Sequence, residues 1–265
     1  MLWLYVEATF AACRTFTAGW YRPTATFLTP SAAYGLVLNI ASIESRLREG
    51  ADGHDGKTPA SLTAKGLPAM KLALGVPATL GKSRVDDDPD AFPRMQSVYQ
   101  QLHNYSVGKG NKVDDPDNLG KKEYSGNIAA RRAHGTKPNI TPVRREFLSD
   151  LRVVVGIDAE ADTLDRVRRG LAGEFPRYGV PFLGDNNYLL DRAELRDEPS
   201  FAYWFTPVTN SDAGPKPRTS RLTVNIDRAD LSRTTSKLFA PDGEATDRPP
   251  ESAWTSVGPN PEGKL

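Results

Sequence analysis

Residues 2–8 read Leu-Trp-Leu-Tyr-Val-Glu-Ala, so apolar side chains alternate with aromatic and acidic ones. A period of two is typical of a strand with one buried face, and we expect this strand to run from Leu2 to Ala8. Beyond residue 30 the apolar spacing becomes that of a helix lying on a sheet, carried by Leu36, Ile40, Ile43 and Leu47. Ser31 is placed to cap this helix and Gly50 to end it.

The remaining elements follow from the same patterns. We expect strands over 67–76, 96–105, 143–156 and 178–190, and a second helix capped by Asp162 and ended by Gly173. Residues 202–208 and 221–226 predict a hairpin, and the tail after Pro241 is expected to be irregular. This order predicts an α+β fold with a ferredoxin-like, RNA-recognition-like β-α-β-β-α-β sheet. The open face of such a sheet is free to meet nucleic acid.

Composition restricts the class of protein. The 265 residues contain 34 Lys and Arg against 33 Asp and Glu, so global charge indicates no polyanionic partner. The single cysteine, Cys13, excludes an internal disulfide framework and a C-x-x-C zinc site. The start has no basic leader region, and no window approaches the roughly 18 apolar residues of a membrane span. We expect a cytoplasmic protein without a membrane partner.

Catalytic and cofactor motifs are missing from the sequence. The three histidines are too far apart for a local metal motif, and no phosphate-binding glycine loop or nucleophile elbow occurs. The aspartates at 86, 87, 88 and 90 do not have calcium-loop spacing, so a mobile, solvated loop over 81–93 is expected. We therefore predict neither a metal nor an organic cofactor.

The segment from Tyr105 to Arg145 has a marked local charge. It carries nine cations against four acids, the cations being Lys109, Lys112, Lys121, Lys122, Arg131, Arg132, Lys137, Arg144 and Arg145. Phosphates attract such a segment, and its aromatic and imidazole rings offer flat faces to unstacked bases. A charged surface loop without a ligand is the alternative.

Two further places favour nucleic acid. Arg14, Trp20, Tyr21 and Arg22 mix guanidinium and aromatic groups after the first strand, and the helix that begins at Ser31 would favour a phosphate at its N-terminus. The second helix carries a cationic flank of Arg166, Arg168 and Arg169. Plain packing of the aromatic rings and solvation of the arginines are the alternatives. Single-stranded RNA is the target that this mixture favours.

Four segments resemble a known family. They are Ala11–Arg14, Thr29–Leu36, Pro142–Leu148 and Pro176–Asp185. Together they resemble the Cas-five subunit of type I CRISPR Cascade, in the DevS-like subgroup of type I-B and related systems, some of them linked to transposons. The resemblance covers residues 1–205. It departs from the family pattern at Cys13, where phenylalanine is usual, at Thr29, which replaces the first of two prolines, and at Asp185, where many relatives have arginine.

The resemblance implies a non-catalytic subunit that grips the 5′ handle of the CRISPR RNA and caps the backbone filament. Residues 1–205 would be the RNA-binding domain, 106–141 a long β-hairpin thumb within it, and 206–265 a C-terminal hairpin and irregular tail. The implied partners are the CRISPR RNA, the Cas-seven backbone subunit and a Cas-eight type large subunit, with target DNA contacted indirectly or near the PAM.

Composition and resemblance together give the expected RNA contacts. They are Arg14, Arg22, Ser31, Tyr34, His103, Tyr105, Lys109, Lys112, Lys121, Lys122, Arg131, Arg132, Arg144, Arg145, Arg168, Arg169, Asn186 and Asn187.

One branch of the family cleaves precursor RNA without a metal. A metal-independent endoribonuclease is therefore the alternative function. Its acid and base would be His103 with Tyr105 and Lys109, or His134 with Lys137.

Overall fold

The computed structural model describes residues 1–15, 21–46, 62–104, 139–177, 179–184, 187–209 and 216–258, with the backbone alone at 101–104 and 139–142. The chain divides into two compact units. Unit 1 comprises Met1–Thr15, Thr24–Gln96 and Phe147–Leu265, and unit 2 comprises Phe16–Pro23 and Ser97–Glu146.

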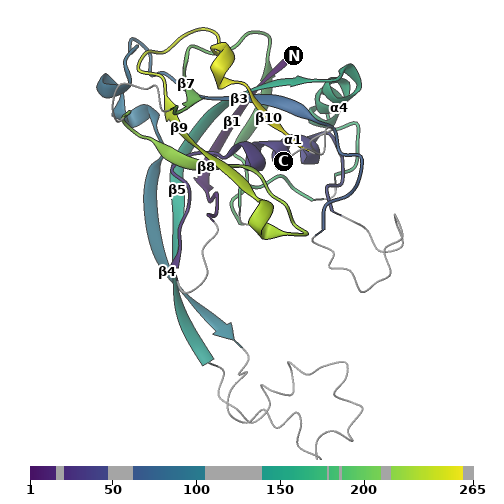
Figure 1. Cartoon of the computed structure of the whole chain (residues 1–265), viewed down its shortest axis with the longest axis vertical. Coiled ribbons are helices and arrows are strands. Elements are labelled where there is room, and N and C mark those ends of the chain that lie inside the picture. The colour runs from purple at the N-terminus through teal and green to yellow at the C-terminus, as the bar shows by residue number, and fades with distance from the viewer. Residues whose placement is uncertain are drawn as a thin grey trace, which may run out of the picture. The chain divides into compact units, whose positions relative to one another are not determined.

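The centre of unit 1 is an antiparallel sheet (Figure 1). Strand β1 (Leu2–Ala11) lies between β5 (Asn139–Ala159) and β6 (Arg192–Arg196), and β3 (Met70–Pro77) lies on the other side of β5. The order is therefore β6-β1-β5-β3, with every neighbouring pair antiparallel. The α+β class and the strand predicted from residue 2 are confirmed.

Two helices pack on this sheet, α1 (Pro30–Ile40) and α4 (Ala161–Leu171). Their apolar sides join one core with the alternate residues of the strands, among them Leu4, Val6, Val153 and Val155. The helices approach closely at Gly170, where an added Cβ would lie 1.8 Å from the carbonyl oxygen of Ile40. None of the helices in the described ranges has the length and apolarity to cross a membrane.

The predicted helix boundaries need correction. Helix α1 ends at Ile40, short of Gly50, because Ser42 has φ 55° and Arg166 donates hydrogen bonds to the carbonyls of Ala41 and Ser42 at 3.2 and 3.1 Å. Thr29 is its N-cap, not Ser31, because Pro30 takes the first helical position. The N-cap of α4 is Glu160 and not Asp162.

The sheet continues through the C-terminal half. Strand β7 (Ala202–Pro207) pairs with β3, β9 (Thr235–Pro241) pairs with β7, and β8 (Ser220–Asn225) pairs with β9. The predicted hairpin of 202–208 with 221–226 is therefore wrong, because β9 lies between its two strands (Figure 1). The predicted strand over 178–190 is also wrong. In the described part of that range the pairing is a single bridge, between Phe182 and Leu189, and the strand begins at Arg192.

The chain after Pro241 contains two short regular elements. A 3-10 turn at Glu251–Ala253 leads into β10 (Thr255–Val257), which pairs with β3. Outside these short elements and two isolated bridges, the tail as far as Gly258 is irregular, as expected, and residues 259–265 lie outside the described part. A further 3-10 turn, Leu231–Arg233, precedes β9.

The acidic loop over 81–93 is built around a buried carboxylate. It contains two 3-10 turns, Val85–Asp87 and Pro89–Ala91, with Asp88 buried between them. The Asp88 carboxylate accepts hydrogen bonds from the Thr79 N–H at 2.8 Å and the Tyr203 hydroxyl at 3.1 Å. Burial by itself raises the pKa of Asp88, but these hydrogen bonds hold it below its ordinary value. The loop is thus part of the folded unit.

Unit 2 is a narrow ribbon built on the first part of β5. Strand β4 (Arg94–Asn104) pairs with β5, and the two-residue strand β2 (Tyr21–Arg22) runs parallel to β5, with Tyr21 opposite Arg144 and Arg22 opposite Arg145. The strand predicted over 143–156 is observed with wider bounds, and the one predicted over 96–105 begins two residues earlier and is described as far as Asn104. Residues 105–138, most of the predicted thumb, lie outside the described part.

Candidate nucleic-acid interface

Distant segments of unit 1 meet at the end of β1. The Ala12 N–H donates to the carbonyl of Leu183 at 2.9 Å, and the Ala25 N–H donates to that of Cys13 at 2.7 Å. Gly184 has φ 86°, and an added Cβ would lie only 1.5 Å from the carbonyl oxygen of Ala12. Only glycine fits there, so the turn that contains Gly184 is held in backbone contact with β1.

Cys13 joins the strand end to the start of α1. Its thiol interacts with the backbone and side chain of Thr29, and burial raises its pKa to about 11 although those hydrogen bonds lower it. The thiol is therefore neutral near pH 7, and it packs in the core and does not serve as a nucleophile. The next residue, Arg14, is exposed and forms a backbone bridge with Thr24.

Two other predicted contacts, Ser31 and Asn187, belong to the same part of unit 1, whereas the hydroxyl of Tyr34 contacts the segment before β3. Ser31 lies in the first turn of α1, with its hydroxyl oxygen 3.1 Å from that of Thr29. Asn187 is exposed in the turn after Gly184. The Tyr34 hydroxyl donates to the carbonyl of Pro68 at 3.0 Å, and burial raises its pKa to about 12. The Tyr34 hydroxyl thus already has a protein partner.

The arginines of α4 lie elsewhere. Gly170 touches Ile40, which is the end of α1 opposite Ser31. Arg169 pairs with Glu174 at 2.7 Å and Asp165 at 3.6 Å, and its guanidinium lies 4.5 Å from the ring centroid of Phe175. Arg168 is exposed on the same turn. The structure does not bring these two arginines to the strand end.

Unit 2 carries a surface of its own that mixes cations and rings. The guanidinium of Arg144 lies 5.3 Å from the ring centroid of Tyr21, and a nitrogen of Arg145 donates to Gln100 at 2.9 Å. The Tyr21 hydroxyl donates to the carboxylate of Glu146, and this hydrogen bond is the main reason why its pKa is raised. The parallel pairing of β2 with β5 therefore unites three predicted contacts, Arg22, Arg144 and Arg145.

Sequence reasoning missed Tyr99, whose residue surface is 73% exposed on β4. The signal was available, because Tyr99 lies in a predicted strand that leads into the basic segment. An exposed aromatic ring beside cations is a common stacking surface for unpaired bases.

The remaining predicted contacts are not described. His103 lies within β4, where only the backbone is given. Outside the described residues lie Tyr105, Lys109, Lys112, Lys121, Lys122, Arg131, Arg132, Asn186 and the alternative catalytic pair His134 and Lys137. In the ranges that the structure gives, His, Cys, Asp and Glu side chains form no group of three able to hold a metal ion.

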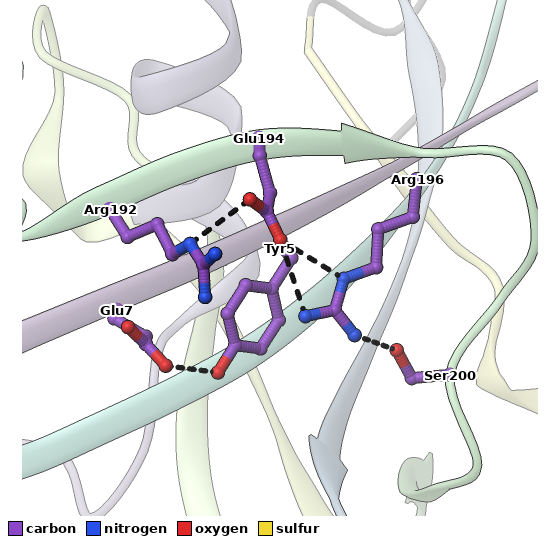
Figure 2. Close-up of polar contacts among 6 residues, drawn as sticks. All are labelled: Tyr5, Glu7, Arg192, Glu194, Arg196 and Ser200. Carbon is purple, nitrogen blue, oxygen red and sulfur yellow. Dashed lines mark hydrogen bonds and ion pairs between the residues drawn. The ribbon is translucent and has the colours of Figure 1, made fainter.

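Part of the expected open sheet face is covered. Figure 2 shows Arg196 of β6 beside the ring of Tyr5, with Glu194 between Arg192 and Arg196. The guanidinium of Arg196 lies 3.8 Å from the Tyr5 ring centroid, and the Tyr5 hydroxyl donates to Glu7. Burial raises the pKa of Tyr5 to about 12, and the hydrogen bond to Glu7 adds to this.

The start of β1 is covered by tryptophans. The ring of Trp3 lies 6.0 Å from that of Trp204 and 6.0 Å from that of Trp254, centroid to centroid. Gly156 leaves room for them, because an added Cβ would lie 2.7 Å from Trp3 and 2.9 Å from Trp254. This tryptophan cluster covers the sheet face at the start of β1, a part of the face that was expected to be open.

Comparison with known proteins adds the following. No protein-family model matches the sequence, and no curated relative matches it. A chain of a structure described as a CRISPR RNA-guided surveillance complex is similar in fold, with a TM-score of 0.50 and 12% identity over 92% of this chain and 90% of that one. A structure described as that of a Cas protein aligns with a TM-score of 0.43 and 13% identity over 93% and 95%. The first of these similarities shows a shared fold.

Proposed function

We propose that this chain is an RNA-binding subunit of a CRISPR RNA-guided surveillance complex, of the Cas-five type, which holds the 5′ handle of the CRISPR RNA. The fold shared with a chain of such a complex supports this, as do the four sequence segments that resemble the family. Its fold would then be ferredoxin-like. The antiparallel order β6-β1-β5-β3, with α1 following β1 and α4 following β5, supports that topology.

The observation that carries the proposal is the meeting at the end of β1. An exposed cation, Arg14, and the N-terminus of an eleven-residue helix are gathered there with the Gly184 turn. A guanidinium and the positive end of a helix dipole attract a backbone phosphate, and exposed polar groups in the turn offer hydrogen bonds to a base. Three of the four resembling segments thus supply one surface.

The surface of unit 2 is a second support. Arg22, Arg144 and Arg145 lie with Tyr21 and Tyr99 on strands that lead into the basic segment 106–141. Cations attract phosphates while exposed rings stack on unpaired bases, and this combination favours single-stranded RNA over a duplex. In this proposal 106–141 is the thumb, and its lysines and arginines contact the same RNA.

The proposed role is structural. The chain would cap the Cas-seven backbone filament beside a Cas-eight type large subunit, and base pairing of the guide would supply target specificity. No nuclease step is assigned to it.

Binding of a repeat-derived RNA that contains the handle tests the proposal. Arg14→Gln should weaken binding about 10- to 150-fold, as expected for loss of a charge-assisted hydrogen bond, while the exposed-arginine control Arg248→Gln should bind like the unmodified protein. Fluorescence anisotropy at two salt concentrations measures both. A protein that does not bind this RNA, or an Arg14→Gln variant equal to the control, would contradict the proposal.

The same RNA, incubated in EDTA, tests the absence of a nuclease step. It should remain intact. A specific cut that disappears in His103→Ala or His134→Ala would establish the metal-independent endoribonuclease instead.

A further inference from the structure

A second aromatic cluster lies near the far end of β1, formed by Phe10, Phe147 and Tyr188. The centroid of Phe10 lies 5.5 Å from that of Phe147 in an edge-to-face contact, with an interplanar angle of 83°. The centroid of Tyr188 lies 6.1 Å from that of Phe10 and 6.0 Å from that of Phe147. These are favourable arrangements for aromatic rings, so the three side chains hold one another in place.

Core packing does not account for the position of Phe10. Ala8 and Ala11 join the main core, and so do Leu151 and Leu148, which lie opposite them on β5. Between these two pairs Phe10 faces outward, opposite Ser149, and 44% of its surface is exposed. Burying that ring would stabilise the protein, so an exposed position that the fold keeps fixed calls for another explanation.

The cluster is anchored before any ligand arrives. The Thr9 N–H and hydroxyl both donate to the carboxylate of Asp191, the hydroxyl at 2.8 Å, and the Asp191 N–H donates to the carbonyl of Glu7 at 2.9 Å. These bonds fasten the segment that carries Tyr188 to β1. A ring held in this way loses little conformational entropy when a flat ligand stacks on it, which favours binding.

The side chains beside the cluster indicate which kind of ligand it binds. Asp150, next to Ser149, and Asp191, bonded to Thr9, line a pocket of about 390 Å³ together with Thr9. The charged lining of this pocket is mainly acidic, with Glu7, Asp90, Asp150 and Asp191 against Arg94 and Arg152. Carboxylates repel a phosphate but accept hydrogen bonds from the exocyclic amino group of a base. An exposed ring with such acceptors beside it fits the face and edge of an unpaired base.

We infer that Phe10, backed by Phe147 and Tyr188, is a stacking site for one unpaired base of the bound RNA. The inference rests on the proposed RNA-binding function and adds a base-stacking position to it. The contact is uncharged, so it contributes affinity that does not depend on salt, in contrast to the arginine contacts.

The test uses the full chain and a single-stranded oligouridine 12-mer with one central 2-aminopurine. Phe10→Ala and Phe10→Leu should each bind about 5- to 100-fold more weakly, because leucine is apolar but not flat, and Phe10→Trp should bind at least as well as the unmodified chain. Quenching of the 2-aminopurine fluorescence should fall in the Ala and Leu variants. The slope of log affinity against log salt should stay unchanged. The matched control is Phe201→Ala, since Phe201 is 42% exposed in unit 1 and lies outside the cluster.

The outcomes separate this inference from the proposed function. If the unmodified chain binds neither the 12-mer nor the handle RNA, both the proposed function and the stacking site are contradicted. If the chain binds RNA and the Phe10 variants match Phe201→Ala, only the stacking site is overturned. Unchanged RNA binding with lost assembly onto the backbone subunits would make the cluster a protein contact and would also overturn the inference. Thermal unfolding of each variant shows that the comparison is between folded proteins.

Discussion

The two ends of β1 carry similar side chains in opposite situations. Near its start, Trp3 packs against Trp204 and Trp254, and Tyr5 lies under Arg196. Near its end, Phe10 is fixed by two neighbouring rings and still 44% exposed. The difference lies in what the rest of the chain places over each end, because residues 250–258 return to cover the first and no described segment buries the second. Aromatic residues on one strand therefore divide into a structural set and a set available to a ligand.

The largest expected effect is a loss of stability at the covered start of β1. Trp204 is fully buried, and its indole N–H donates to the carbonyl of Thr246 at 3.1 Å. Trp204→Ala should lower the free energy of unfolding by about 3–5 kcal/mol, while Phe10→Ala should lower it by roughly 1 kcal/mol or less. Urea unfolding followed by fluorescence measures both. Equal losses would mean that both ends are core and that Phe10 is not a free surface.

A glycine substitution probes how tightly the covered end is packed. Gly156→Ala would push a methyl group into Trp3 and Trp254, so we expect a loss of about 1–3 kcal/mol in the free energy of unfolding. Gly35→Ala is the control, because nothing lies within 4 Å of its added Cβ and alanine favours the helix, so this variant should be unchanged or slightly more stable. Thermal unfolding compares them. A harmless Gly156→Ala would show that the tryptophans are loosely packed.

The salt dependence of RNA binding distinguishes the proposed stacking contact of Phe10 from the arginine contacts with phosphates. Arg144→Gln and Arg145→Gln should each reduce the slope of log affinity against log salt by about 1, because each removes one phosphate neutralisation. Phe10→Ala should leave the slope unchanged while lowering affinity. Titrations at several salt concentrations check this. A slope that responds to Phe10 would mean that the cluster acts on phosphates and not on a base.

The smallest effect is spectroscopic. Burial and Glu7 raise the pKa of Tyr5 to about 12, so its phenol remains protonated well above pH 10. A tyrosine introduced as Phe10→Tyr should instead ionise near pH 10, the value of an exposed phenol. Absorbance titration to pH 11 should gain one ionising tyrosine in Phe10→Tyr and lose none in Tyr5→Phe. If the added tyrosine does not ionise below pH 11, the far end of β1 is covered as well.

Local patterns predicted the elements that local interactions determine. The alternation in 2–8 and 67–76 gave β1 and β3, and the resembling segments pointed to Arg14 and Ser31 at one surface. Helix α1 was predicted too long because the carbonyls at its end accept hydrogen bonds from Arg166, which is distant in the sequence. Strand β9 was missed because Ser236 and Lys237 interrupt its apolar pattern.

The stacking site was also beyond the sequence. A period of two places residue 10 on the same side as Leu4 and Val6, in the core. In the structure the side chain of Phe10 faces outward. The partner strand β5 is irregular beside it, because Asp150 has a φ of 59°. Pairing between strands, which no local pattern contains, therefore decides whether Phe10 is buried or exposed.

The position of β1 in the chain has a consequence for biosynthesis. Its pairing partners, residues 148–157 and 192–196, are synthesised long after it, and Trp254, which contacts Trp3, is synthesised later still. Native contacts between such distant residues form slowly, so a nascent chain presents β1 as an apolar, unpaired strand until these partners have been synthesised. Chaperone dependence and losses to aggregation should therefore be greatest in chains shortened before Trp254.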